Sequence, residues 1–256
     1  MAEVIAICNQ KGGVGKTTTA INLSAALAAA EKRTLLIDLD AQGNATTGMG
    51  IDKHHVAGSI YNVIIDEADL STLRLDTELP FLKMLPSSPS LVGAEVELVS
   101  LVSRETRLKQ RLDGIRNEFD YIIIDCPPSL GLLTLNALVA ADSVLIPVQC
   151  EYYAMEGIAD LQRTIALVKG RLNPGLATKG IILTMFDSRN NLSHQVQNEM
   201  RNHFKNAVFQ VVIPRNVRLS EAPSYGKPIL LYDVESKGAQ SYFDLAKEIL
   251  SSAAQQ

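Results

Sequence analysis

The residues whose types and spacing suggest chemistry most directly form one short run near the N-terminus. The run is Lys11-Gly12-Gly13-Val14-Gly15-Lys16-Thr17-Thr18, and it lies between an apolar segment and an Ala/Leu-rich segment. Glycines allow successive backbone N–H groups to point at phosphate oxygens, and a helix that begins near Lys16 would add its positive end. Lys16 would then pair with the β- and γ-phosphates, and the Thr17 hydroxyl would bind Mg²⁺. The run therefore predicts a site for ATP and Mg²⁺.

A second lysine distinguishes this loop from the common phosphate-loop pattern G-x-x-x-x-G-K-[ST]. Gln10 stands where that pattern has its first glycine, and Lys11 precedes the glycines. The pattern K-G-G-x-G-K-[ST] resembles the deviant Walker A motif of the ParA/MinD superfamily. The resemblance implies that Lys11 reaches the nucleotide of the opposite subunit in an ATP-sandwiched homodimer. From its chemistry alone, Lys11 could equally serve the nucleotide of its own subunit.

Carboxylates for the metal and for the attacking water are expected where apolar strands end. Asp38 and Asp40 follow the apolar run of TLLIDLDAQGN, and Asp125 follows that of YIIIDCPPS. The carboxyl ends of strands beside a phosphate loop are the best places for such acids, although an acid after a strand can also be a turn or helix cap. The two segments are similar to the switch and Walker B segments of the same superfamily. The resemblance implies that Asp125 belongs to the Mg²⁺ shell, that Asp40 positions the lytic water and that Asp38 lies near the metal.

Longer segments indicate which group of proteins within the superfamily the chain resembles. The segments NQKGGVGKTT, DLDAQGN, DCPPSLG, VQCEYYAMEG and VIPRNVRLSEAPSYGKPI are similar to those of chromosomal ParA (Soj) proteins. This resemblance implies that Pro214 and Asn216 contact the adenine, and that Glu151 and Met155 lie near the nucleotide across the dimer. On chemistry alone, Pro214 could simply end a strand and Glu151 could be a solvated charge.

The charge of the chain is strongly polarised. Residues 161–230 hold ten Lys or Arg and three acids, whereas the rest holds 14 basic and 25 acidic residues, for a net charge of -4. A basic region on an acidic protein is compatible with a DNA phosphate footprint, and also with an ordinary solvated surface. ParA dimers bind double-stranded DNA without sequence preference. The resemblance implies this role for Arg189 and Arg218, with Arg215 as a third contributor.

A partner and a cycle follow from the same resemblance. A ParB-type protein would stimulate an ATP hydrolysis that is slow alone, since the chain shows no evident arginine finger of its own, and would thereby drive segregation of chromosomes or plasmids. A MinD-like ATPase that positions itself on membranes is the nearest alternative, but the ending KEILSSAAQQ lacks the basic amphipathic character of a membrane-docking helix. A nucleotide-gated interaction protein without a DNA role is the other alternative.

The elements that would position these residues are expected to form an α/β fold of the P-loop NTPase type. This fold is a mostly parallel sheet with helices on both faces, and it is expected because apolar β-rich runs alternate with helical stretches. Strands are expected at residues 4–8, 34–38, 81–85, 121–125, 143–148, 180–186 and 208–214. Helices are expected at residues 17–30, 93–117, 131–140, 155–172, 191–205 and 237–253. One domain, residues 1–256, is expected, with the nucleotide site at 8–45, 121–130, 150–156 and 210–222 and the DNA-facing region at about 161–230.

Composition excludes several other classes of protein. The 256 residues are 46% apolar and 20% charged, an ordinary globular balance. No apolar run reaches the roughly 18 to 20 residues that span a bilayer, and Glu3 stands where a secretory signal would be basic. The cysteines, Cys8, Cys126 and Cys150, show no disulfide or zinc spacing. The sequence predicts a cytoplasmic protein with no membrane partner, and the resemblance implies association with the bacterial nucleoid.

Overall fold

One eight-stranded sheet organises the computed structural model, which describes residues 1–151 and 154–253. The strand order is β3-β4-β2-β5-β1-β6-β7-β8, and neighbouring strands are parallel except for the antiparallel pair β3 and β4. The strands are β1 (Glu3–Ile7), β2 (Thr34–Asp38), β3 (Leu75–Asp76), β4 (Leu82–Leu85), β5 (Tyr121–Asp125), β6 (Ser143–Gln149), β7 (Ala177–Phe186) and β8 (Val208–Pro214). The seven predicted strands are confirmed, with shifts of a few residues at some ends. The prediction missed β3, which is too short to show an alternating pattern.

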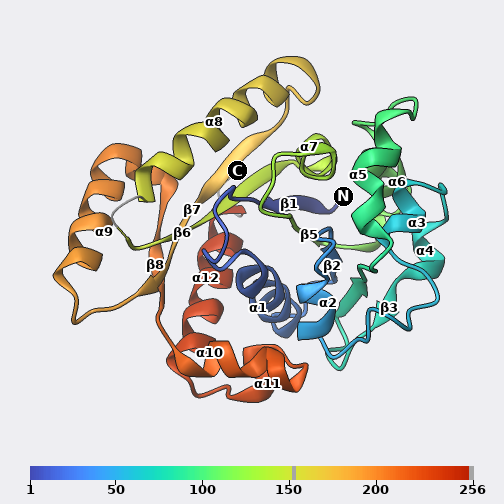
Figure 1. Ribbon diagram of the computed structural model, residues 1–256. Helices are drawn as coiled ribbons and strands as arrows, with labels where there is room; N and C mark the ends of the chain where they lie inside the picture. Colours follow the sequence, from blue (N-terminus) through green and yellow to red (C-terminus); the bar gives the residue numbers. More distant parts are fainter. Residues whose placement is uncertain (152–153, 254–256) are drawn as a thin grey trace.

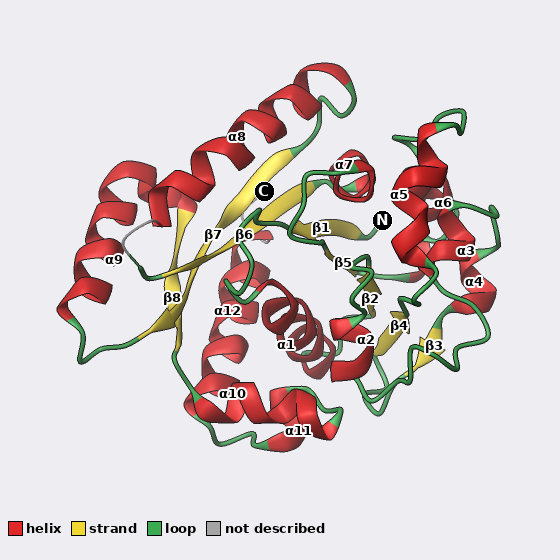
Figure 2. Ribbon diagram, viewed as in Figure 1, coloured by secondary structure: helices red, strands yellow, loops and turns green. Residues whose placement is uncertain are grey.

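Helices cover both faces of this sheet, as expected for a parallel α/β fold (Figures 1 and 2). The helices are α1 (Lys16–Ala29), α2 (Asn44–Gly48), α3 (Ile60–Ile64), α4 (Leu70–Leu73), α5 (Leu91–Val99), α6 (Arg107–Asp113), α7 (Leu132–Ala140), α8 (Ala154–Arg171), α9 (Asn191–Phe204), α10 (Val217–Glu221), α11 (Ile229–Tyr232) and α12 (Lys237–Ala253), with 3-10 turns η1 (Arg116–Glu118), η2 (Lys205–Ala207) and η3 (Ala222–Tyr225). Residues of α3 and α5 to α9 belong to the core on one face, and residues of α1 and α10 to α12 belong to the core on the other. Within the described residues, no helix has the length and apolar composition needed to cross a bilayer.

The central strands are buried on both faces, which explains why their sequences are continuously apolar. In β1, Val4 and Ala6 pack into one core cluster, whereas Ile5 and Ile7 pack into the other. Successive side chains of a strand point to opposite faces, so each face needs its own apolar residues. The two cores hold β1, β2 and β5 between them, and these strands position the loops at their carboxyl ends.

The expected helix at 93–117 is wrong as a single element. Helix α5 ends at Val99, α6 begins at Arg107, and η1 follows it. Between α5 and α6, Ser103 takes a left-handed backbone with φ of 54°, and Arg104 Nη1 donates a hydrogen bond of 2.8 Å to the Val99 carbonyl. The turn lets both helices pack against α7, which a continuous helix of that length could not do.

Opposite charges accumulate at the two ends of the sheet. The basic region, residues 161–230, includes β7 and β8 at one edge. Residues 60–99, which include β3 and β4 at the other edge, carry seven acidic and two basic residues. The charge asymmetry of the sequence therefore becomes a charge asymmetry across the sheet, with the phosphate loop between its ends (Figure 1).

Candidate functional site

The phosphate loop connects the carboxyl end of β1 to the first turn of α1. Gly13 and Gly15 have φ of 73° and 89°, in the left-handed region that favours glycine. A Cβ built on Gly12 or Gly13 would meet no described atom within 4 Å, so open space lies beside the loop. Gly15 caps α1 without a side-chain hydrogen bond to the helix. The first N–H groups of α1 are thus available to an anion.

Lys16 provides the cation at this helix start. Its side chain is buried, and its Nζ donates a hydrogen bond of 3.0 Å to the Lys11 carbonyl. Burial lowers the pKa of Lys16, while the charge of Asp125 is the main influence that raises it. A desolvated ammonium has a strong need for an anionic partner, because few water molecules compensate its charge.

Asn9 holds the loop against the sheet. Its Nδ2 donates to the Pro147 carbonyl at 2.7 Å, and its Oδ1 accepts a hydrogen bond from the Lys11 N–H at 3.0 Å. The second bond fixes the start of the loop, and the first ties it to β6. Asn9 was not among the predicted site residues, although its position two residues before Lys11 is a signal that could have found it.

Asp38 and Asp125 meet at the carboxyl ends of adjacent strands. They are register partners in the β2–β5 pair, and both are fully buried. Neither carboxylate oxygen of Asp125 has a hydrogen-bond partner among the described residues. Burial, followed by the charge of Asp38, raises the pKa of Asp125 well above its usual range, while Thr17 and Lys16 oppose the rise.

These features fit a Mg²⁺ site. Mg²⁺ in nucleotide sites is held by one or two carboxylates together with hydroxyl, phosphate and water oxygens. A buried carboxylate that lacks partners is costly unless a cation compensates it. Asp125 meets that description, and Thr17 is close enough to influence its pKa.

Asp38 also holds the segment that follows β2. Its Oδ2 accepts hydrogen bonds from the N–H and the hydroxyl of Thr46, both at 2.7 Å. Burial is the main cause that raises the pKa of Asp38 to about 6, and the Thr46 bonds oppose it. Thr46 was not predicted, because only the fold brings α2 back to the end of β2.

Asp40 lies in a more open position than Asp38. Its side chain is half-buried, and its Oδ1 accepts a hydrogen bond of 2.9 Å from the Gln42 N–H. The Ser87 hydroxyl donates to the Asp40 carbonyl at 2.8 Å, which ties the switch segment to the loop before α5. The backbone is therefore fixed while the carboxylate stays accessible to water.

Lys11 forms an ion pair with Glu151 of its own chain. Both side chains are partly exposed, so the pair is at the surface rather than in the core. Met155, in the first turn of α8, is partly buried and packs against the core. Residues 152–153, within the expected site range 150–156, lie outside the described residues. The structure thus places Lys11 and Glu151 together within one chain.

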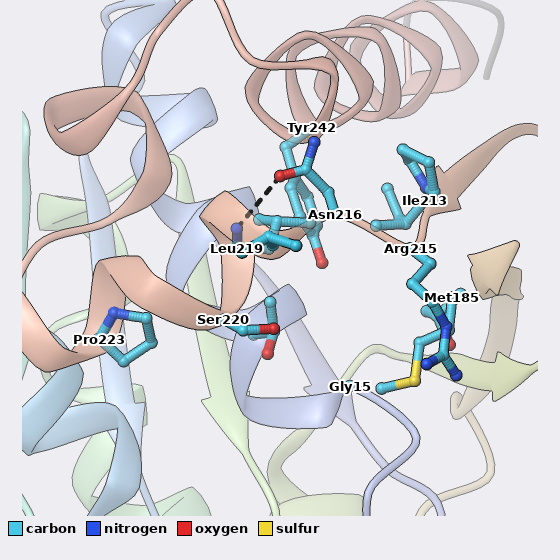
Figure 3. Close-up of a pocket in the computed structure, with 13 residues that line it drawn as sticks. Gly15, Met185, Ile213, Arg215, Asn216, Leu219, Ser220, Pro223 and Tyr242 are labelled. Atoms are coloured by element: carbon cyan, nitrogen blue, oxygen red, sulfur yellow. Dashed lines mark hydrogen bonds between the residues drawn. The ribbon is translucent and has the colours of Figure 1, made fainter. Parts of the chain in front are cut away.

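The expected adenine contacts line a cavity of about 580 Å³ beside the loop (Figure 3). Pro214 ends β8, and Asn216 caps α10 by accepting a hydrogen bond of 3.3 Å from the Leu219 N–H. Both residues line the cavity together with Gly15, so it continues to the phosphate loop. Arg215, expected at DNA, is exposed and also lines this cavity.

Several cavity residues were not predicted. Tyr242 comes from α12 and its hydroxyl lies 3.2 Å from that of Thr19. Thr184 donates a hydrogen bond of 2.8 Å to the Val14 carbonyl, and Met185 has a left-handed φ of 51°. These residues are far from the loop in sequence, and no local pattern marks them.

The arginines that were expected to contact DNA are exposed and ion-paired. Arg189 is 87% exposed and bonds Asp187 through two nitrogens, at 3.0 and 2.9 Å. The Arg189 hydrogen bonds lower the pKa of Asp187 to about 2. Arg218 pairs with Glu221 at 2.9 Å and with Asp233 at 3.3 Å. Both side chains are accessible to a ligand, but each would have to exchange an acidic partner for it.

Similarity to known proteins extends over nearly the whole chain. A family model described as an AAA domain matches residues 2–178. The chromosome partitioning protein ParA of Myxococcus xanthus is 59% identical over 98% of this chain and 88% of its own length. The sporulation initiation inhibitor protein Soj of Bacillus subtilis is 56% identical over 97% of this chain and 98% of its own.

Solved structures share the fold. Cobyrinic acid a,c-diamide synthase of Mycobacterium smegmatis with bound ADP and magnesium is similar with a TM-score of 0.88 and 37% identity, covering 99% of this chain and 96% of that one. The septum site-determining protein MinD of Pyrococcus horikoshii, complexed with Mg-ADP, is similar with a TM-score of 0.80 and 26% identity, covering 100% and 98%. With its deviant phosphate loop and paired strand-end aspartates, the chain belongs to the ParA (Soj) family of chromosome-partitioning ATPases, within the ParA/MinD superfamily.

Proposed function

We propose that this ATPase uses ATP and Mg²⁺ as a switch that joins two chains and places the dimer on DNA. The observation that carries the proposal is the meeting of the buried Lys16, Asp38 and Asp125 at one end of the sheet, with the half-exposed Lys11 beside them. Such an arrangement binds a nucleotide and leaves one cation available to a second subunit. The relatives named chromosome partitioning proteins support the biological role.

Each part of the site has a task in hydrolysis. The N–H groups of the glycine loop and Lys16 orient the phosphates, and Pro214 and Asn216 hold the adenine in the cavity. Thr17 and Asp125 would hold Mg²⁺, with Asp38 near it, and the bound ion would supply positive charge to the phosphate oxygens. Asp40, fixed through its backbone by Ser87 and accessible through its carboxylate, orients the attacking water.

Lys11 links the nucleotide to dimerisation. In the single chain its ammonium pairs with Glu151 at the surface. When two chains meet face to face, Lys11 exchanges this partner for the phosphates of the facing subunit, and Glu151 and Met155 come near that nucleotide. Surface ion pairs contribute little stability, so the exchange favours the dimer once phosphate is available.

The closed dimer binds double-stranded DNA through its basic region, and this places the protein on the nucleoid in the cytoplasm. Arg189 and Arg218 supply phosphate contacts, with Arg215 as a third contributor. About three such residues per subunit would neutralise roughly six phosphates, and the logarithm of affinity would fall with that of salt at a slope near -5. Binding without sequence preference follows from contacts to the backbone alone.

A ParB-type partner completes the cycle. Hydrolysis is slow alone, because the sequence shows no evident arginine finger of the kind that accelerates related reactions. The partner stimulates turnover, the dimer separates, and DNA is released. Repetition of this cycle at partner-bound DNA drives segregation of chromosomes or plasmids.

Sizing of the Asp40→Ala protein tests the proposal. We expect a monomer with ADP and a stable dimer with ATP that co-elutes with duplex DNA of unrelated sequence and dissociates as salt rises. A dimer that ignores DNA across the salt series would instead support a nucleotide-gated interaction protein. Retention of the ATP dimer on anionic vesicles, with no retention on DNA, would support a MinD-like membrane role.

A further inference from the structure

A closed ring of hydrogen bonds joins the segment after β2 to the loop after β4. Asp38 Oδ1 accepts from the Asp40 N–H at 3.2 Å, and Asp38 Oδ2 accepts from the N–H and the hydroxyl of Thr46, both at 2.7 Å. The Thr46 hydroxyl in turn accepts from the Ser87 N–H at 2.9 Å. The Ser87 hydroxyl donates to the Asp40 carbonyl at 2.8 Å and closes the ring. We call Asp38, Asp40, Thr46 and Ser87 the switch ring.

The fold brings the members of the switch ring together from separate parts of the chain. Ile37 of β2 is the register partner of Leu85 of β4, so the residues that follow these parallel strands also lie side by side. α2 folds back to the end of β2 and contributes Thr46. The loop that contains Ser87 is held in turn by α3, whose first N–H donates to the Pro86 carbonyl at 2.9 Å.

Burial protects the bonds of the switch ring from water. Asp38, Thr46 and Ser87 are fully buried, whereas Asp40 is half-buried. Hydrogen bonds in the interior are electrostatically stronger than those in water, and a fully satisfied buried network holds its members in one arrangement. The ring binds Asp40 at both its N–H and its carbonyl. It therefore fixes the backbone from which the Asp40 carboxylate projects.

The two buried acids at the strand ends differ in their hydrogen bonds. The carboxylate of Asp38 accepts three, whereas neither oxygen of Asp125 has a partner among the described residues. A carboxylate oxygen has two lone pairs, so the two donors of Thr46 fill Asp38 Oδ2. Asp125 is thus the freer acid for a cation, while Asp38 is engaged in the ring. Because these acids are register partners, the ring also places Asp40 relative to the metal centre.

We propose that Thr46 and Ser87 are positioning residues for ATP hydrolysis, which act by holding Asp40 in a fixed place relative to Asp38. Residues that support a functional group in this way typically change activity by roughly 10- to 100-fold when they are removed. A displacement of about 1 Å at the reacting groups is enough for such an effect. The inference rests on the proposed function, in which Asp40 orients the attacking water.

Removal of one hydroxyl at a time tests this role in the full chain. Ser87→Ala breaks the bond to the Asp40 carbonyl, and Thr46→Val removes the Thr46 hydroxyl at a similar side-chain volume. Thr46→Ser keeps that hydroxyl and is the conservative variant. Ser24→Ala is the matched control, because Ser24 is also fully buried but its hydroxyl has no hydrogen-bond partner among the described residues.

Two quantities are measured for each variant: the affinity for a slowly hydrolysed ATP analogue by calorimetry, and the single-turnover rate of hydrolysis with Mg²⁺ and excess protein. We expect Ser87→Ala and Thr46→Val to hydrolyse ATP roughly tenfold more slowly at unchanged affinity, because the position of Asp40 affects the transition state rather than binding. Ser24→Ala and Thr46→Ser should keep the rate of the unaltered chain. Equal rates in Ser87→Ala and Ser24→Ala would overturn the inference, and this comparison decides even where Thr46→Val does not fold. Parallel losses of rate and affinity would overturn it in favour of a ring that only stabilises the fold.

A double variant distinguishes the inference from the proposed function. If Ser87 acts through Asp40, then Ser87→Ala added to Asp40→Ala should cause no further loss of rate, because no carboxylate is left to position. A further loss of the same size in the double variant would overturn the role of Ser87 and leave that of Asp40 intact. Full turnover by Asp40→Ala alone would refute the proposed role of Asp40, and the inference with it.

Discussion

The centre of the sheet and its basic edge hold their charged side chains in different environments. At the centre, Lys16, Asp38 and Asp125 are buried and lie at fixed strand and helix ends. At the edge, Arg189 and Arg218 are exposed and paired with acids on the surface. Buried charges interact strongly because water does not screen them. Exposed charges are screened by water and salt, so each contributes little and their effect depends on how many there are. Single residues should therefore be indispensable at the centre and partly replaceable at the edge.

The largest effect is expected from Lys16→Ala. Loss of a buried cation that we propose contacts the phosphates should weaken ATP binding roughly 100-fold or more, measured by calorimetry with a slowly hydrolysed ATP analogue. Lys247→Ala, at an exposed pair with Asp244, is the matched control and should bind normally. Equal affinities of the two variants would show that the centre does not depend on Lys16.

Asp125→Asn separates stability from activity at the centre. The raised pKa of Asp125 means that the folded state disfavours its charge, so its contribution to stability falls as pH rises through the folded pKa. Near pH 7 without metal, the variant should be more stable, by about 1–3 kcal/mol in denaturant unfolding. Its Mg²⁺-dependent ATP turnover should be lost. A less stable variant, or one with full turnover, would contradict the assignment of Asp125.

Arg189→Ala should have a smaller effect, confined to DNA. Removal of one phosphate contact per subunit should lower the salt slope of the dimer by about two and leave ATP affinity unchanged. Arg33→Ala is the matched control, because Arg33 forms a similar two-nitrogen pair with Asp120. If both variants kept the slope of the unaltered chain, Arg189 would be an ordinary solvated charge.

The smallest effect is expected from Asp187→Asn. This change frees Arg189 from its pair and should strengthen retention on DNA by roughly two- to fivefold, because exposed pairs contribute little. The measurement is a titration of labelled duplex DNA with the ATP-bound protein at fixed salt. A decrease in retention would show that Asp187 orients Arg189 for binding rather than competing for it.

The sequence predicted which residues of the centre lie together in the fold, for a local reason. The loop from Lys11 to Thr18 is contiguous, and its glycines fix its backbone wherever the strand before it lies. Asp38 and Asp125 were found because parallel strands place their carboxyl ends together. The split of the expected helix at 93–117 was missed, because the turn at Ser103 depends on packing against α7 rather than on a Gly or Pro signal.

Contiguous residues and strand periodicity thus determined the α/β class, the phosphate loop and the strand-end acids from the sequence by itself. Only the tertiary structure decided that Lys11 pairs with Glu151, that Tyr242 lines the cavity beside Gly15, and that Arg215 faces this cavity. It also decided that the valines of α5 point outward while its leucines are buried. These contacts depend on which surfaces pack together in the folded chain. Residues far apart in the sequence show no local pattern that predicts such packing.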